Sequence, residues 1–222
     1  MTSSHDPTPA PPALLVRLAW IVALLVVAGA AITWVTQATR ERIARNEAAR
    51  IMKDLVQVLP AGSFDNQPDQ DSIAVHDPAL GSDAPLTVYR ARRAGVPVAA
   101  VVTVVARQGY VGPIRLLVAF DPAGTVLGVH ILAHQETAGV GDRIEPGHSG
   151  FLRSFVGRSL ASPLPAGWDV RREGGEFDQL TGATTTSRAV VGAVRDAALW
   201  FAAHRADVFT APAAATIPPS AS

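Results

Sequence analysis

Residues Phe177 to Val191 read FDQLTGATTTSRAVV, which places a small turn and a crowded set of hydroxyl groups directly before an apolar helix. Gly182 permits a tight or left-handed turn, and Ala183 adds little bulk beside it. The apolar spacing that follows predicts a helix over Ala189–His204. An ordinary helix N-cap needs one hydroxyl side chain, so the additional hydroxyls need an explanation.

Four hydroxyl residues, Thr184 to Ser187, stand at the entry of this helix. Unpaired backbone N–H groups and the positive end of the helix dipole favour a phosphate there. A hydroxyl in this position can cap the helix, hydrogen-bond a bound phosphate, or be esterified by one. From the residues alone a threonine-rich N-cap is the plainer interpretation, and phosphate chemistry is the alternative.

Upstream, segments rich in Val, Ile and Leu predict β-strands. The turn sequence DPAG at Asp121–Gly124 has Pro at its second position, which favours a tight turn between two of them. We therefore expect an α+β domain with a mostly antiparallel sheet and packed helices. The candidate strands are Thr87–Ala91, Val96–Val105, Ile114–Asp121 and Thr125–Ala133, with a further possible strand at Trp168–Arg172 and a short helix at Phe151–Leu160.

The N-terminal region contains eighteen residues without a charge, Leu18 to Val35. As a helix this run is about 27 Å long, close to the thickness of a bilayer's hydrocarbon core. Trp20 and Trp34 lie near its ends, where interfacial aromatic residues occur. A cleaved signal peptide is the alternative, but the apolar run is long and no small-x-small cleavage site ends it. We expect one permanent transmembrane anchor.

The chain is expected to be organised in five parts. Ile43, Ile51 and Leu55 are among the apolar residues that recur at helical spacing after the anchor, and Pro60 and Gly62 end that pattern. The predicted parts are a flexible tail at 1–12, the transmembrane anchor at 13–38, an amphipathic helix and linker at 39–62, the globular domain at 63–209 and a disordered Pro/Ala-rich tail at 210–222.

Composition excludes several classes of function. With 19 basic and 19 acidic residues among 222, the chain has no overall field that would attract nucleic acid, and it has no cysteine for thiolate chemistry or iron–sulfur ligation. The sequence contains neither a GxGxxG motif nor a P-loop lysine signature. His134 and Glu136 would share a strand face and could ligate a metal, but no third ligand suggests itself, so no metal site is predicted.

Three motifs together resemble one family. D-x-x-T-G-A-T, Asp178 to Thr184, resembles the flavinylation motif of FMN-binding domains, in which a flavin transferase joins the FMN phosphate to a threonine. GYVGPIRLLVAFD at Gly109–Asp121 and HQETAGVGDRI at His134–Ile144 precede it in the order found in the G subunit of the Rnf ion-translocating electron-transport complex. The resemblance runs from the anchor to about His204.

The resemblance implies the residues that bind the cofactor. Thr184, which follows Gly-Ala, would carry the covalent FMN through its phosphoryl group, with Thr186 as second choice. Asp178 would be read by the transferase, and the loop from Glu136 to Gly141 would lie along the flavin ring. Tyr110 and Gly112 would border the site. The implied cofactor-binding residues are Thr181, Gly182, Ala183, Thr184, Thr185 and Thr186, with Glu136, Thr137, Gly139 and Gly141.

The loop departs from the family at two positions, where Ala138 replaces Pro and Val140 replaces Leu in ETAGVG. Without Pro the loop loses a preset backbone angle, which leaves the detailed flavin contacts open. The glycines and the Glu136–Thr137 pair remain, so neither the predicted tether nor the predicted fold depends on these changes.

By the same resemblance, the protein would be a membrane-anchored flavoprotein subunit of a complex that moves electrons between ferredoxin and NAD. It would relay electrons through FMN, without catalysis of its own, beside the other subunits of the complex. Two alternatives remain: the C subunit of a sodium-pumping NADH:quinone reductase, which shares the motif but has a larger domain, and a non-redox anchored scaffold whose threonines only cap a helix.

The family is found in the bacterial inner membrane, with this domain on the periplasmic side. Charge counting argues for the opposite orientation, because Arg17 precedes the anchor whereas four arginines follow it. We follow the family. The four arginines are Arg40, Arg42, Arg45 and Arg50.

Overall fold

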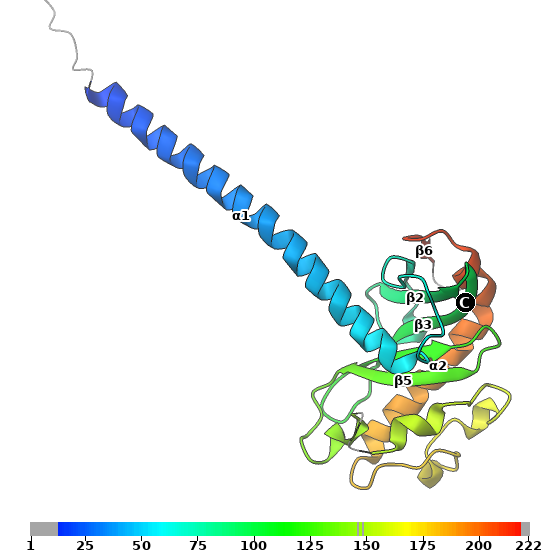
Figure 1. Cartoon of the computed structure of the whole chain (residues 1–222). Coiled ribbons are helices and arrows are strands. Elements are labelled where there is room, and N and C mark those ends of the chain that lie inside the picture. The colour runs from blue at the N-terminus through cyan, green and yellow to red at the C-terminus, as the bar shows by residue number, and fades with distance from the viewer. Residues whose placement is uncertain (1–12, 146, 148, 219–222) are drawn as a thin grey trace, which may run out of the picture. The chain divides into compact units, whose positions relative to one another are not determined.

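The structure is a computed structural model and describes residues 13–145, 147 and 149–218 (Figure 1). Its contacts divide the chain into one unit up to Ala49 and another from Arg50 onward. Helix α1 runs without a break from Ala13 to Val58, so the expected anchor and the expected amphipathic segment belong to one helix. It ends just before Pro60, as predicted, because the residue before a proline disfavours helical geometry.

The N-terminal unit contains a candidate membrane span. Val16–Thr39 comprises 24 residues with a mean hydropathy of 2.4, and none of it is buried. A helix of this length is about 36 Å long, enough to cross the hydrocarbon core of a bilayer. The uncharged run identified in the sequence lies inside this span. By length and composition, the helix is able to cross a membrane.

The second unit is built on a six-stranded sheet with the order β5-β4-β3-β2-β1-β6. Strands β1 to β5 form antiparallel ladders between sequence neighbours, and β6 pairs with β1 in parallel. The mostly antiparallel α+β fold expected from the sequence is confirmed. The strands are β1 Ser72–Val75, β2 Leu86–Arg93, β3 Val96–Ala106, β4 Ile114–Phe120, β5 Val126–Ala133 and β6 Thr216–Ile217.

The central strands β3 and β4 are buried on both faces of the sheet, and they are apolar on both sides. On β4, Leu116 and Phe120 join the cluster that includes the apolar side of helix α2, which spans Thr184–Thr210 (Figure 1). The alternate residue Leu117 joins a second cluster with Leu55 at the end of α1. This alternation follows from the period of two in a strand. The sheet therefore holds α2 on one face and the last turns of α1 on the other.

Two local predictions were wrong, and one strand was missed. The predicted helix at Phe151–Leu160 is only a 3-10 turn over Phe151–Phe155. No strand forms at Trp168–Arg172, where short 3-10 turns leave only an isolated bridge between Val170 and Phe177. Strand β1 was not predicted, because its four residues are too few to show a periodic pattern.

The expected disorder after Ala211 does not extend over the whole segment. Thr216 and Ile217 pair with β1, and the buried Arg90 fixes the chain just before them through hydrogen bonds to the carbonyl oxygens of Val208 and Ala211. The guanidinium group supplies hydrogen bonds that these carbonyl oxygens need. The segment therefore has a defined conformation here despite its Pro/Ala-rich composition.

The end of α1 approaches β5 so closely that one strand position requires glycine. A Cβ atom on Gly128 would lie 2.6 Å from the carbonyl oxygen of Val58, which is backbone and cannot move aside as a side chain can. Nearby, His130 Nε2 lies 3.7 Å from Asp54 Oδ1, and burial lowers the pKa of His130 while Asp54 partly opposes that effect. These contacts hold the last turns of α1 against the sheet.

We expect Gly128→Ala to destabilise the second unit by about 1–3 kcal/mol, the usual effect of overpacking. Urea unfolding of the full chain in detergent measures it. Gly150→Ala is the matched control, because a Cβ there meets nothing within 4 Å and its φ of −83° suits alanine. Equal stability of the two variants would contradict the close packing of α1 on β5.

Candidate functional site

A tight turn before α2 explains the sequence Thr-Gly-Ala. The Ala183 N–H donates to the Leu180 carbonyl oxygen over 3.0 Å, which closes a four-residue turn. Gly182 has a φ of +81°, the left-handed region that a side chain disfavours and that the third residue of a type II turn requires. Ala183 is the N-cap of α2, so the helix begins at Thr184 and not at Ala189. The alanine side chain makes no capping hydrogen bond.

The early start of α2 decides where each hydroxyl lies. Thr184 is half-buried and Thr185 is exposed, whereas Thr186 is 1% exposed and Ser187 is fully buried. The N-cap interpretation of these hydroxyls is wrong, because the N-cap position belongs to Ala183. The non-redox scaffold thereby loses the feature that motivated it.

Ser187 holds the turn against the helix. Its hydroxyl accepts a hydrogen bond from the Leu180 N–H over 3.0 Å and donates one to the Ala183 carbonyl oxygen over 2.9 Å. Both contacts are buried, where an unpaired polar group is costly. Ser187 therefore fixes the turn and the register of the first helical residues.

Glu136 joins three segments that are distant in sequence. One carboxylate oxygen accepts from the Val111 N–H over 3.1 Å, and the other accepts from the Thr186 hydroxyl over 2.5 Å. Its side chain packs on Gly141, where a Cβ would lie 2.7 Å from that of Glu136. Its own N–H donates to His134 Nδ1. The predicted loop is thus attached both to the 109–112 segment and to the start of α2.

A cavity of about 530 Å³ opens between these segments. It brings together eight of the ten predicted cofactor-binding residues; Thr181 and Gly139 lie outside its lining. Tyr110, expected at the border of the site, also lines it, as does Val140 of the predicted loop. Arg172 lines it too, and the sequence did not indicate Arg172 as a contact. The lining residues are Tyr110, Glu136, Thr137, Val140, Gly141, Arg172, Gly182, Ala183, Thr184, Thr185 and Thr186.

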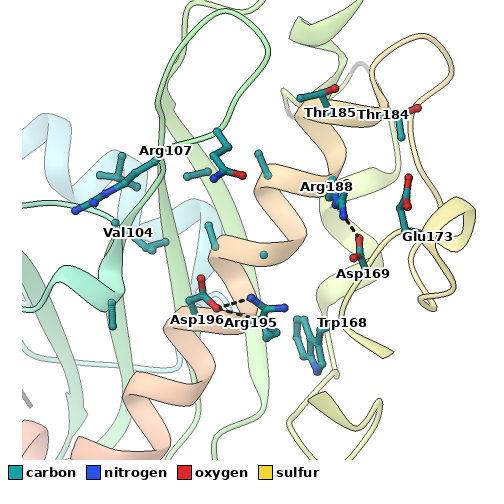
Figure 2. Close-up of a pocket in the computed structure, with 18 of the residues that line it drawn as sticks. Val104, Arg107, Trp168, Asp169, Glu173, Thr184, Thr185, Arg188, Arg195 and Asp196 are labelled. Carbon is teal, nitrogen blue, oxygen red and sulfur yellow. Dashed lines mark hydrogen bonds and ion pairs between the residues drawn. The ribbon is translucent and has the colours of Figure 1, made fainter. Parts of the chain in front are cut away.

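A second hollow of about 770 Å³, here called the charged groove, runs along α2 (Figure 2). Thr184 and Thr185 line both hollows. Figure 2 shows them at one end of the groove, with Arg188 pointing toward Asp169. The two charged groups are 3.7 Å apart. The charged residues that line the groove are Arg107, Asp169, Glu173, Arg188, Arg195 and Asp196.

Asp178, the acidic residue of the threonine motif, lines neither hollow. It is exposed and pairs with Arg171, with 2.9 Å between Oδ1 and Nε. This position leaves its carboxylate accessible to another protein. Arg171 and Arg172 are both exposed, and Arg172 also faces the cavity.

The structure does not arrange His134 and Glu136 as metal ligands. The ring of His134 accepts from the Glu136 N–H at Nδ1 and contacts Glu145 at Nε2, 2.8 Å away, while the Glu136 side chain faces Thr186. Over residues 13–145, 147 and 149–218, no group of three or more His, Cys, Asp or Glu side chains is placed to hold a metal ion.

The cavity suits a flavin nucleotide by its size and donor set. Its volume falls within the range of small-molecule sites, roughly 300–1,000 Å³. The hydroxyls of Thr184 and Thr185 and the helix N-terminus are donors for a phosphate, and Arg172 adds a positive charge. Tyr110, 73% exposed, and Val140 offer apolar surface for a ring.

We expect Ser187→Ala to destabilise the chain by about 1–3 kcal/mol, because the Leu180 N–H loses its buried partner. Thermal unfolding in detergent measures the change. Thr185→Ala is the control, since this neighbouring side chain is exposed and its loss should change stability by less than about 0.5 kcal/mol. A Ser187→Ala chain as stable as the control would show that the turn does not depend on this hydroxyl.

Comparisons with known proteins agree with this geometry. The family described as "FMN-binding domain" matches residues 109–199, which include both sequence loops of the cavity and most of α2. Proteins named as the G subunit of an ion-translocating oxidoreductase complex are similar over most of their length. The one from Cereibacter sphaeroides (strain ATCC 17029 / ATH 2.4.9) is 45% identical over 78% of this chain and 77% of its own.

Two further relatives carry the same name. The one from Pseudomonas aeruginosa (strain UCBPP-PA14) is 42% identical over 86% of this chain and 90% of its own. The one from Shewanella baltica (strain OS223) is 41% identical over 80% of this chain and 84% of its own. With three motifs, the fold and the cavity in agreement, the chain belongs to the family of G subunits of ion-translocating oxidoreductase complexes and contains an FMN-binding domain.

Proposed function

We propose that this chain carries FMN through a phosphoester bond to Thr184 and relays electrons within a membrane-bound ion-translocating complex. Family membership and the FMN-binding domain support the flavin and the complex. The observation that carries the attachment site is the position of Thr184, which is the half-buried threonine where the cavity and the charged groove meet.

The accessibility of the three threonines favours Thr184 over its neighbours. Thr186 is 1% exposed and its hydroxyl is donated to Glu136, so a transferase would have to open the helix start to reach it. Thr185 is accessible but exposed to solvent. Thr184 combines access with a partly enclosed position, which suits a group that must be added by another protein and then held.

The surroundings of Thr184 suit a charged phosphodiester. The new group would retain one negative charge at the first helical residue, beside the open N–H groups of the helix terminus and the positive end of its dipole. Arg188 lies one helical turn further on, where residues four apart are neighbours. Its ion pair with Asp169 is long at 3.7 Å, which leaves guanidinium donors for a phosphate.

The transfer requires an activated flavin donor, because a phosphate monoester has no good leaving group. We infer a flavin dinucleotide. The Thr184 oxygen would form the new P–O bond as the pyrophosphate bond breaks; the second nucleotide would leave and the hydroxyl proton would pass to solvent or to a base of the transferase. The exposed Asp178 is available for recognition by that transferase.

Once bound, FMN supplies the electron-transfer chemistry. The chain's own residues would hold the phosphate at Thr184, and Tyr110 and the loop from Glu136 would line the space for the ring. The reaction is completed only with the redox groups of the other subunits, so the chain is an electron-transfer subunit and has no catalytic acid or base of its own.

Replacing the acceptor should remove the covalent flavin without unfolding the chain. We expect Thr184→Val, expressed with a flavin transferase, to show no flavin fluorescence after denaturing gel separation. Thr185→Val and Thr186→Val are matched controls that should remain fluorescent. A fluorescent Thr184→Val chain would contradict the assignment, and loss of fluorescence in Thr186→Val alone would move the site to Thr186.

We further propose that Val16–Thr39 anchors the chain in the bacterial inner membrane, with the flavin domain on the periplasmic side. A covalent tether is most useful outside the cytoplasm, where a lost cofactor cannot be replaced readily. The arginines after the span favour the other orientation, so this proposal rests on the family and on the tether.

Because the sequence contains no cysteine, a single introduced cysteine can be labelled selectively, which tests the orientation. We expect a cysteine at the exposed position Ala161 to react with a membrane-impermeant maleimide in intact spheroplasts. Ser4→Cys, on the other side of the span, should react only after the membrane is permeabilised. The reverse pattern would place the flavin domain in the cytoplasm.

A further inference from the structure

We propose that Glu136 sets the reduction potential of the flavin, because its buried negative charge lines the cavity and opposes the addition of electrons to the ring. This inference rests on the proposed function, in which FMN is tethered at Thr184 and its ring occupies the cavity. It assigns Glu136 a role in tuning the cofactor, beyond that of a loop residue in contact with it.

Two hydrogen-bond donors face the Glu136 carboxyl group: the Val111 N–H donates to one oxygen and the Thr186 hydroxyl to the other. An ionised carboxylate accepts at both oxygens, so two donors stabilise its negative charge. The 2.5 Å contact to Thr186 is at the short end of the distances typical of O–H···O⁻ bonds.

The same bonds fix the position of this charge. Val111 and Thr186 belong to a loop and to the start of α2, and each holds one carboxylate oxygen. The residue is 7% exposed, so solvent screens its charge poorly, yet it contributes to the cavity lining. Thr184 and Thr186 both line this cavity, so the carboxylate bound by Thr186 and the proposed tether share the same space.

Among the described residues, one other charged side chain lines the cavity, and it differs in its exposure. Arg172 is exposed, so solvent and salt screen its charge. The charge of Glu136 acts through a drier region, where electrostatic interactions are stronger. The field at the ring is therefore expected to be dominated by the carboxylate.

The sign of the effect follows from charge balance. An electron delivered by the redox group of a partner subunit adds one negative charge to the flavin, unless a proton is taken up with it. A fixed negative charge nearby raises the free energy of the reduced form and lowers the reduction potential. Removing that charge should raise the potential.

The test measures the effect of charge loss in the full-length chain, loaded covalently with FMN in detergent. Spectroelectrochemical titration gives the midpoint potential. We expect Glu136→Gln, which keeps the shape and removes the charge, to raise the one-electron reduction constant by at least about tenfold, or about 59 mV.

Glu145→Gln is the control for charge alone. This carboxylate pairs with His134, is about half exposed and does not line the cavity, so its loss should change the reduction constant by less than about threefold. A Glu136→Gln potential equal to that of the unmodified chain would overturn the proposal. An equal rise in Glu145→Gln would also overturn it, because the loss of an exposed charge outside the cavity would then have the same effect.

If Glu136→Gln is not loaded with FMN, Glu136→Ser decides the question. Serine removes the same buried charge and keeps a hydroxyl group in the lining. We expect the potential to rise, and an unchanged potential would overturn the proposal. Absence of covalent FMN from the unmodified chain is a separate result, which would refute the proposed function itself.

Discussion

The Ser187 hydroxyl connects the two sides of the turn that precedes α2, since it accepts from the Leu180 N–H and donates to the Ala183 carbonyl oxygen. This buried pair of bonds sets the residue at which the helix begins. With Ala183 as N-cap, Thr184 stands at the rim of the cavity and Thr186 turns inward. The difference in exposure between these two identical side chains is therefore produced by helix register.

The cavity depends on one carboxylate as much as on the threonine motif. Glu136 is held by Val111 on one side and Thr186 on the other, and Gly141 allows the loop to pass close to it. Segments separated by dozens of residues are joined in this way. The sheet supports this arrangement, because the two cavity loops adjoin the neighbouring strands β4 and β5 and α2 packs on the sheet.

Much of this could be predicted from sequence, and the failures have physical causes. Strands β2 to β5 are rich in branched residues and were located closely, whereas the short β1 was missed. The start of α2 was placed too late because threonine has modest helix propensity, and the buried contacts of Thr186 and Ser187 override it. The contiguous motif predicted Thr184 as a site residue, and Thr184 lines the cavity. Arg172 was not recognised, because non-periodic turns bring it to the cavity.

The most direct test of the account is peptide mapping of the native protein, isolated from the membranes of its own host. Cleavage after arginine releases Glu173–Arg188, a peptide that contains every hydroxyl of the cluster. The account predicts that this peptide carries one FMN, and that fragmentation places the added mass on Thr184. An unmodified peptide, in a preparation with the complex intact, would contradict it.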